Sequence, residues 1–538
     1  PFKSINKTGK LLPIFSDHCE NGFKNKLSPY EIVNSFFKIY CEDFSEVEMK
    51  TLLFRFIQYI ERQVVLFDAI EDASFPHINN LDGIGTLRNI KEAFEKSSSK
   101  ETLIKYLKKI KIKPVLTAHP TQFYPGSVLG IITDLSYAIE NNDLIEIKSL
   151  LAQLGKTPFF KKKKPTPYDE AVSLTWYLEN MFYNSISNIQ KYIKSNIADN
   201  KFINYDLISL GFWPGGDRDG NPYVTNEITI KTAFKLRSDI IKNYYRDVRK
   251  LRRRLTFQNV EDVVIDIENR LYLSMDEELE NPSISLVELK EKLLFIRKKI
   301  IKDHESLFLE QVEELIDKVN IFGYHFASLD IRQDSGIHND VFKRIFKEKF
   351  GIKMSKKYLE MNEDDKINFL SNSKFKSNIN DFSDSIVLKT LGSINAMRNI
   401  QKSNGEKGCH RYIISHNESA LNLFEVYYMF KFTGWINPTV DIVPLFETID
   451  DLNISVSVME KVYENKLYRN HLKSRNNEQV IMLGFSDGTK DGGYFTANWN
   501  ILKAKEKLSK KSAKHGIKVK FFDGRGGPPA RGGGNTHQ

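Results

Sequence analysis

Most of the chain carries apolar residues at three- and four-residue spacing, which is the pattern of amphipathic helices. Clear examples are residues 47–73, 126–154, 169–197 and 226–255. The sequence contains no repeat of fixed period and no long low-complexity linker between such segments. It therefore predicts a predominantly helical protein.

Six short apolar runs of a different kind interrupt the helical pattern. Each is a few residues long, rich in Val, Ile and Phe, and flanked by polar or turn residues, as expected for strands buried on both faces. The six runs cover residues 113–121, 321–333, 410–418, 439–448, 478–487 and 517–527.

Each of these runs ends in polar or charged residues. In chain order these ends include His119, Arg332, Ser415 with His416 and Asn417, Glu447, Asp487, and Arg525.

Strands that alternate with helices pair in parallel, and a closed parallel barrel presents all its strand carboxyl ends on one face. The prediction is an α/β protein with an incomplete (β/α)8 TIM-like barrel, about six strands of eight, and large helical insertions. We expect a helical N-terminal region at 1–113 and the partial barrel at 114–538, with an insertion between the first two strands at about 123–320. Six unrelated strands in separate α/β units remain the alternative.

Composition narrows the class of protein. The 538 residues are 41% hydrophobic and 12% aromatic, which is enough for a large core, and no apolar run reaches the roughly 20 residues needed to span a bilayer. The three cysteines are far apart, which excludes a disulfide framework or zinc ribbon and suits a reducing cytoplasm. The N-terminus has no Met and no signal-peptide pattern, so the chain is expected to lack its true beginning.

The net charge of +10 comes mostly from lysines spread along helical segments. A nucleic-acid partner would require basic residues gathered on one face with aromatic residues among them. The dense basic run considered for such a role is Lys161–Lys164. We expect no nucleic-acid and no membrane partner, and a small anionic substrate is compatible with the charge.

Two carboxylates follow consecutive predicted strands. Glu447 and Asp487 offer the oxygen ligands that Mg²⁺ and Mn²⁺ prefer, and Mg²⁺ takes only one or two carboxylates from a protein. Each alone could equally be a helix cap or a loop acid. Together they predict a divalent-metal site.

Two arginines also end strands. Arg332 and Arg525 could each fork onto a phosphate or carboxylate. The alternative is a structural ion pair with Asp330 or Asp523.

His119 and Lys490 are further candidates. His119 could act as a base or as a phosphate contact, or it could be structural. Lys490 could reach an anion from its glycine-rich turn, or it could simply be exposed.

Two glycine-rich segments complete the candidates. The loop at 211–225 carries Asp217, Asp219 and Asn221, but its glycine is misplaced for an EF-hand and Ile228 occupies the twelfth position. The closing segment at 524–534 could be an anion-binding loop or an RNA-binding tail. Its position directly after an apolar strand favours the loop.

The motifs resemble the phosphoenolpyruvate carboxylase family from about residue 100 onward. They occur in the family's order, and Lys161–Lys164 also falls within a family-like segment. The motifs are "VLTAHPTQ", "WPGGDRDGNP", "LDIRQDS", "PLFETIDDL", "IMLGFSDGTKDGG" and "FFDGRGGPPARGGG".

The resemblance implies a lyase of the carboxy-lyase class in an anaplerotic role that feeds the tricarboxylic acid cycle. It would carboxylate phosphoenolpyruvate irreversibly with bicarbonate, giving oxaloacetate and phosphate through carboxyphosphate and a metal-bound enolate. It also implies that the full-length protein is a cytoplasmic homotetramer.

The resemblance assigns roles residue by residue. Glu447 and Asp487 would hold Mg²⁺ or Mn²⁺, Arg332 and Arg525 would bind and act on the substrate anion, and His119 would act on carboxyphosphate. Lys490 would be an active-site lysine, Trp213 would lie near the substrate methylene, and Arg531 would join catalysis and dicarboxylate inhibition.

The sequence departs from the family in three places. A basic pair is missing after Gln122, Phe485 and Gly488 replace the usual Tyr and Ser, and Asp523 stands where many members carry His. Family members also continue well beyond this C-terminus, so we expect a fragment that is inactive alone. Another barrel enzyme acting on phosphoenolpyruvate, a non-catalytic RNA-binding protein and a degenerate gene remnant are the alternatives.

Overall fold

The computed structural model of this chain describes residues 8–81, 83–96, 100–117, 126–159, 165–197, 204–277, 279–373 and 377–525. Compactness divides the chain into two units, Pro1–Asn89 with His119–Lys164, and Ile90–Ala118 with Pro165–Gln538. This grouping does not test the predicted division after residue 113, which stays a prediction. Among the described helices, none is both long and apolar enough to cross a membrane.

The first unit is built from helices. The hydroxyls of Ser28 and Ser45 cap the second and third helices, and Glu31 and Glu48 bond back in each capping box. The third helix packs along the sixth through a small apolar core that includes Val65. The helices are α1 (Thr8–Lys24), α2 (Pro29–Tyr40), α3 (Glu46–Ile78), α6 (Gly126–Glu140) and α7 (Leu144–Lys156).

Two short helices, α4 (Leu87–Lys96) and α5 (Lys100–Leu107), lead toward the first strand. The helices of the second unit then fall into two groups. Those before the third strand are α8 (Pro167–Tyr177), η3 (Leu178–Phe182, a π-helix), α9 (Tyr183–Asn196), α10 (Asn226–Arg252), α11 (Glu261–Leu273), α12 (Leu286–Asp303) and α13 (Leu309–Phe322).

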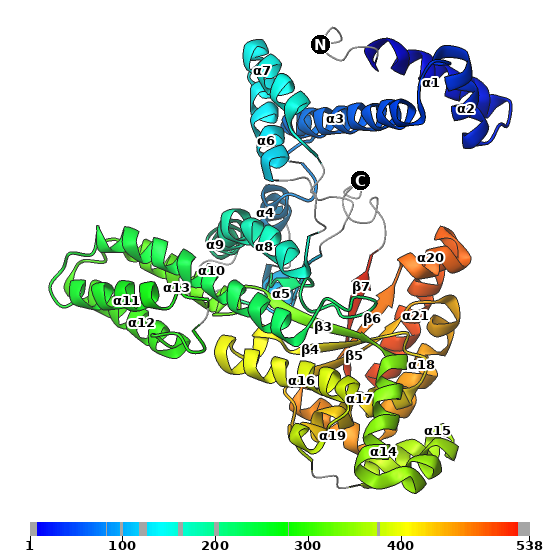
Figure 1. Cartoon of the computed structure of the whole chain (residues 1–538). Coiled ribbons are helices and arrows are strands. Elements are labelled where there is room, and N and C mark those ends of the chain that lie inside the picture. Colours follow the sequence, from blue (N-terminus) through cyan, green and yellow to red (C-terminus); the bar gives the residue numbers. More distant parts are fainter. Residues whose placement is uncertain are drawn as a thin grey trace. The chain divides into compact units, whose positions relative to one another are not determined.

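The helices after the third strand alternate with strands and cover the sheet (Figure 1). They are α14 (Ser335–Glu360), α15 (Glu363–Asn372), η4 (Ile379–Asp381), α16 (Ser385–Asn404), η5 (Glu406–Gly408), α17 (Ala420–Phe432), α18 (Ile449–Glu464), α19 (Lys466–Ser474), α20 (Ser486–Gly492) and α21 (Tyr494–Lys514).

Within the described residues, seven strands form one sheet in chain order, and every neighbouring pair is parallel. All carboxyl ends therefore lie along one edge. The strands are β1 (Val115–Leu116), β2 (Gly211–Phe212), β3 (Ser328–Asp334), β4 (Arg411–Ser415), β5 (Asp441–Phe446), β6 (Glu478–Gly484) and β7 (Lys518–Gly524).

The six predicted strands are present, in the predicted order and orientation. The seventh, β2, was not predicted, because its two residues open a glycine-rich loop and carry no alternating pattern. It divides the long helical stretch that was expected between the first two strands. The separate-units alternative is wrong, since all seven strands share one sheet.

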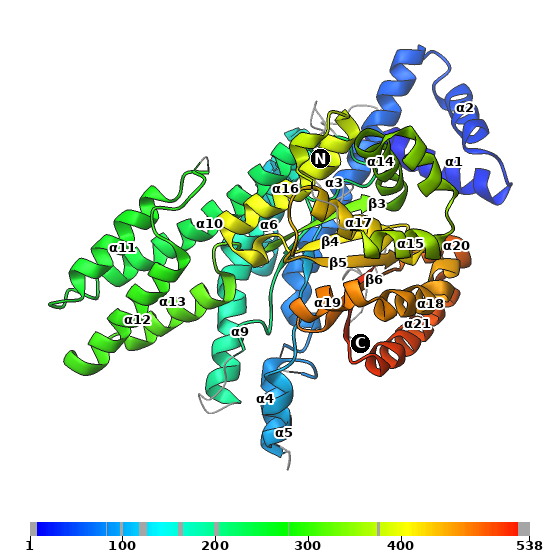
Figure 2. The ribbon, with the colours of Figure 1, turned by 90° about the horizontal axis from the view of Figure 1, so that it is seen from below.

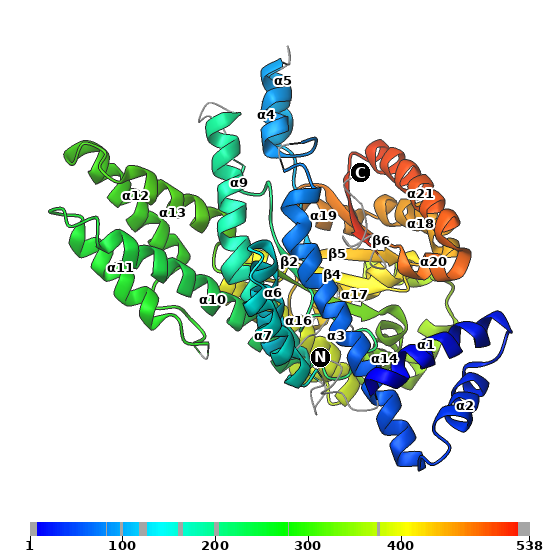
Figure 3. The same ribbon diagram turned by 90° about the horizontal axis from the view of Figure 1, so that it is seen from above.

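Side chains of the later strands alternate between two buried faces. Ile413, Val443, Leu445, Val480 and Met482 form one small cluster. Their sequence neighbours belong instead to the main core, where the sheet packs against its helices. Figure 2 shows strands β3–β6 within the surrounding helices, and Figure 3 shows α18, α20 and α21 beside β5 and β6. The sheet is thus a curled parallel arc with a packed inner face; the complete eight-stranded barrel stays a prediction.

Candidate active site

The carboxyl end of β3 holds Arg332 against the loop that follows β2. The Asp217 carboxylate accepts hydrogen bonds from Arg332 Nε at 2.7 Å and Nη2 at 3.1 Å, and from Trp213 Nε1 at 2.8 Å. Burial lowers the pKa of Arg332, but the carboxylates of Asp217, Asp219 and Glu447 together outweigh burial and raise that pKa overall. Arg332 and Trp213, which the sequence predicted to belong to the site, are therefore both held by Asp217, for which the sequence predicted no role in the site.

The glycines of this loop allow it to lie directly on β3. A Cβ on Gly216 would lie 1.9 Å from the backbone oxygen of Asp330, and Gly215 has a φ of +82°. The Arg332 N–H donates to the Gly216 oxygen at 3.1 Å, and the Arg218 N–H donates to the Arg332 oxygen at 2.9 Å. The Gly-Gly pair was the signal in the sequence that could have revealed this close approach.

Glu447 follows β5 and points toward the same place. Its side chain is 7% exposed, with Oε1 4.0 Å from Arg332 Nη1 and Oε2 accepting the His416 backbone N–H at 3.1 Å. Burial raises the pKa of Glu447, the nearby Asp487 raises it further, and His416 and Arg332 only partly offset this. Glu447 is thus a buried carboxylate whose charge is incompletely compensated.

Asp487 lies just after β6, the strand next to β5, in the first turn of α20. A Cβ on Gly484, the last residue of β6, would lie 3.2 Å from Glu447 Cγ, so the two strand ends are close. Lys490 Nζ is 2.8 Å from Asp487 Oδ1, and this hydrogen bond raises the pKa of Lys490. The structure brings Glu447, Asp487 and Lys490 to one strand edge; their sharing of a metal ion stays a prediction.

His416 is a neighbour of the site that was noted in the sequence without a role. Its Nδ1 lies 2.7 Å from Asp334 Oδ2, and its Nε2 lies 3.4 Å from Glu447 Oε2. The hydrogen bond to Asp334 raises the pKa of His416. A φ of +49° turns its backbone so that the N–H also meets Glu447. Only the fold could show this, because His416 contacts strands distant in sequence.

The remaining predicted residues are only partly described. The Arg525 guanidinium carbon lies 5.9 Å from the centre of the Phe485 ring. His119, Arg531 and the closing segment beyond Arg525 lie outside the described residues, as does Lys161–Lys164. Their proposed roles stay predictions.

The suggested ion pair between Arg332 and Asp330 is wrong. Asp330 binds Arg411 instead, accepting from Nε at 2.8 Å and from Nη2 at 2.7 Å, and both side chains are buried. Asp523 has a counter-charge in Lys505, 2.6 Å from its Oδ1. The acid that replaces the family's usual His is therefore paired with a lysine.

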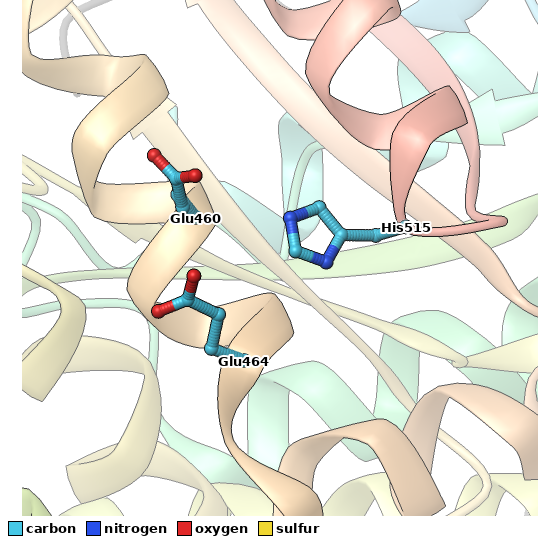
Figure 4. Close-up of side chains that lie close together, drawn as sticks. All are labelled: Glu460, Glu464 and His515. Carbon is cyan, nitrogen blue, oxygen red and sulfur yellow. The ribbon is translucent and has the colours of Figure 1, made fainter.

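A second cluster of metal-ligand side chains lies on the helices outside the sheet. Glu460 and Glu464 of α18 face His515, which follows α21, and their ligand atoms all lie within 4.8 Å of one another (Figure 4). Glu460 already pairs with Lys511, and no strand-end residue takes part. We do not assign the predicted metal to this cluster.

Two surface cavities lie away from the strand ends. One of about 770 Å³ lies beside α8 and α10 and is lined by residues including Tyr168, Lys231 and Phe234. None of the predicted site residues lines it. We place the candidate site at the strand ends because ligands of parallel α/β folds bind outside the carboxyl ends of strands.

Comparison with known proteins identifies the family of this chain. Residues 71–285 and 274–538 match the sequence model of the family described as phosphoenolpyruvate carboxylase. Similar proteins named phosphoenolpyruvate carboxylase occur in Nitrosomonas eutropha and Nitrosomonas europaea. Each is 28% identical over 527 residues, covering 85% of this chain and 56% of the relative. The chain thus spans about half the length of these curated relatives.

The fold and the site define a class: parallel α/β proteins that gather carboxylates and arginines at the carboxyl ends of neighbouring strands. Within that class the family match is specific and covers most of the chain. The chain belongs to the phosphoenolpyruvate carboxylase family, which confirms the resemblance seen in its motifs.

Proposed function

We propose that this chain carries part of the active site of an enzyme that carboxylates phosphoenolpyruvate with bicarbonate, giving oxaloacetate and phosphate. Family membership and the names of both relatives support the reaction. The observation that carries the proposal is the meeting of Glu447, Asp487 and Arg332 at one strand edge.

The carboxylates fit a divalent cation. Glu447 is buried, its nearest arginine nitrogen is 4.0 Å away, and Asp487 adds a second negative charge beside it. Two carboxylates with room for water and substrate oxygens suit Mg²⁺ or Mn²⁺. When bound, the ion would stabilise negative charge that develops on substrate oxygens.

The arginines would bind the substrate's anionic groups. Attack of bicarbonate on phosphorus, which forms carboxyphosphate, builds negative charge that guanidinium groups offset. Arg332 Nη1 faces Glu447, so an anion bound at Nη1 would lie next to the Glu447 carboxylate, and a cation is needed there to balance the charge. Arg525 would supply the second guanidinium.

The other assignments rest on the family motifs. His119 would act on carboxyphosphate, Lys490 would serve as an active-site lysine, and Trp213 would lie beside the substrate methylene. Arg531 would take part in catalysis and in inhibition by dicarboxylates. An anaplerotic role, a cytoplasmic location and a homotetrameric full-length protein complete the proposal, together with the inactivity of this chain alone.

Metal binding tests the site in the chain itself. Mn²⁺ titration followed by electron paramagnetic resonance should show one site, which Glu447→Gln and Asp487→Asn each weaken at least tenfold. Glu464→Gln is the matched control, because Glu464 belongs to the outer cluster. If Glu464→Gln removes the binding and the strand-end variants retain it, the assignment of the ion is wrong.

Activity tests the reaction. Phosphate release that requires both phosphoenolpyruvate and bicarbonate, coupled to oxaloacetate formation, is expected from the full-length protein and not from the 538-residue chain. Pyruvate in place of oxaloacetate would point to another enzyme of the phosphoenolpyruvate class. Activity in the chain alone would overturn the expected inactivity but not the proposed reaction.

A further inference from the structure

Asp217 is the common acceptor for several groups at the candidate site. Besides the two bonds from Arg332 and the one from Trp213, its Oδ1 accepts the Asp219 backbone N–H at 3.3 Å. Charge-assisted, two-point contacts of this kind fix the plane of a guanidinium as well as its position. One carboxylate therefore sets the geometry of both an arginine and a tryptophan.

The two groups held by Asp217 are also in contact with each other. The Arg332 guanidinium carbon lies 5.3 Å from the centre of the Trp213 ring, within cation–π range. Trp213 also packs in a T-shaped arrangement with Phe522 of β7, with ring centroids 5.9 Å apart, and the Arg411 guanidinium carbon lies 4.8 Å from the centre of the Phe522 ring. The stack is thus supported by the inner face of the sheet.

This arrangement restricts how Arg332 meets an anion. Nε and Nη2 are committed to Asp217, and Nη2 also lies 3.6 Å from Asp219 Oδ2. Nη1 is the nitrogen that points toward Glu447. The side-on Nε/Nη2 edge of Arg332 is therefore occupied by Asp217, and the guanidinium meets the carboxylate pair with its Nη1 end.

We propose that Asp217 is a positioning residue that holds Arg332 and Trp213 as one unit, so that Arg332 meets the substrate anion through Nη1. The substrate part of this inference rests on the proposed function, whereas the coupling of the two side chains does not. Asp217 itself makes no contact with the reacting atoms in this scheme.

The test uses the 538-residue chain labelled with 5-fluorotryptophan. Its four tryptophans give separate ¹⁹F signals, and Trp213→Phe identifies that of Trp213. Asp217→Asn replaces an acceptor oxygen by a donor that opposes the donors of Arg332. Asp219→Asn is the matched control, because it removes the same charge from the same loop, and the Trp213 Nε1–H donates to Asp217 and not to Asp219.

We expect Asp217→Asn to move the Trp213 signal by more than its linewidth while the other three signals stay in place, which also shows that the variant is folded. Arg332→Met should move the same signal, and the double variant should add no further shift. Asp219→Asn should leave it unmoved. An unmoved Trp213 signal in Asp217→Asn, or full additivity in the double variant, overturns the inference.

The substrate arm separates this inference from the proposed function. Phosphoenolpyruvate with the diamagnetic Mg²⁺ should shift the Trp213 signal of the parent chain and lose that effect in Asp217→Asn. If the parent shows no effect of phosphoenolpyruvate but Asp217→Asn still moves the signal, the coupling stands and the proposed substrate is wrong. A substrate effect retained in Asp217→Asn would overturn the role of Asp217 toward the anion.

Discussion

The buried ion pair between Asp330 and Arg411 makes the sharpest stability prediction. The pair joins β3 to β4 on the inner face, with side chains 0% and 7% exposed. Removing one partner of such a pair strands a charge away from water. We therefore expect Asp330→Asn to destabilise the sheet far more than the loss of a surface ion pair.

The size of the effect follows from the contacts. Asp330 accepts two charge-assisted hydrogen bonds, at 2.8 and 2.7 Å, each worth about 1.5–3 kcal/mol. Asparagine keeps one acceptor, and the Phe522 ring offsets the stranded guanidinium by about 1 kcal/mol. The expected cost is about 3 kcal/mol, the lower end of the range for breaking a buried pair.

Hydrogen exchange measured by mass spectrometry reports this locally, without assuming that the whole chain unfolds in one step. Amides of β3 and β4 should exchange about 100-fold faster in Asp330→Asn, since each 1.4 kcal/mol is tenfold. The control is Asp364→Asn, whose partner Lys461 is 2.9 Å away on the surface, with an expected change below about 1 kcal/mol.

A rescue variant completes the test. Asp330→Leu combined with Arg411→Met replaces both charges by apolar side chains and should recover most of the lost protection. Equal exchange rates in Asp330→Asn and Asp364→Asn would refute the reasoning, because they would mean that burial of the pair contributes nothing.

Two further predictions concern the loop on β3 and the response to pH. Gly216→Ala should destabilise β3 by about 1–3 kcal/mol or more and disturb Arg332, because the added Cβ would clash with the Asp330 backbone oxygen. The control is Gly130→Ala in α6, where a Cβ meets open space and the change should be neutral or stabilising. Hydrogen exchange measures both effects. Burial lowers the pKa of His338 from its ordinary value of 6.5 to about 3. Between these two pH values the unfolded chain binds more protons than the folded chain, so the free energy of unfolding should fall as the pH decreases from 6.5 to about 3. His338→Gln should remove about one proton from the pH dependence of urea unfolding; an unchanged slope would contradict the assignment.

The strands show how far local pattern reaches. Six runs of β-branched and aromatic residues were identified because buried parallel strands are apolar on both faces. β2 was missed because its two residues, Gly211 and Phe212, are too few to show a period, and its strand character comes only from pairing with β1 and β3. The polar residues at the strand ends were predictable as well, because each of them directly follows one of these apolar runs.

The contacts between those ends were not predictable. The ion pair with Asp330 that was considered as the alternative role of Arg332 was wrong, because alternating side chains place Asp330 and Arg332 along one face of β3 with different partners. Asp217 and His416 reach the site from segments over 80 residues from their partners Arg332 and Asp334. No local pattern records such a meeting.

The sequence alone determined the helical content, six of the strands, the strand edge at which Glu447, Asp487 and Arg332 lie, and the family. Those properties depend on periodicity and on short motifs, which a chain carries in any conformation. Only the tertiary structure decided that Asp217 binds Arg332 and Trp213 together and that Arg411 takes Asp330. A hydrogen bond depends on distances of a few ångströms between atoms, and the packing of the whole sheet sets those distances.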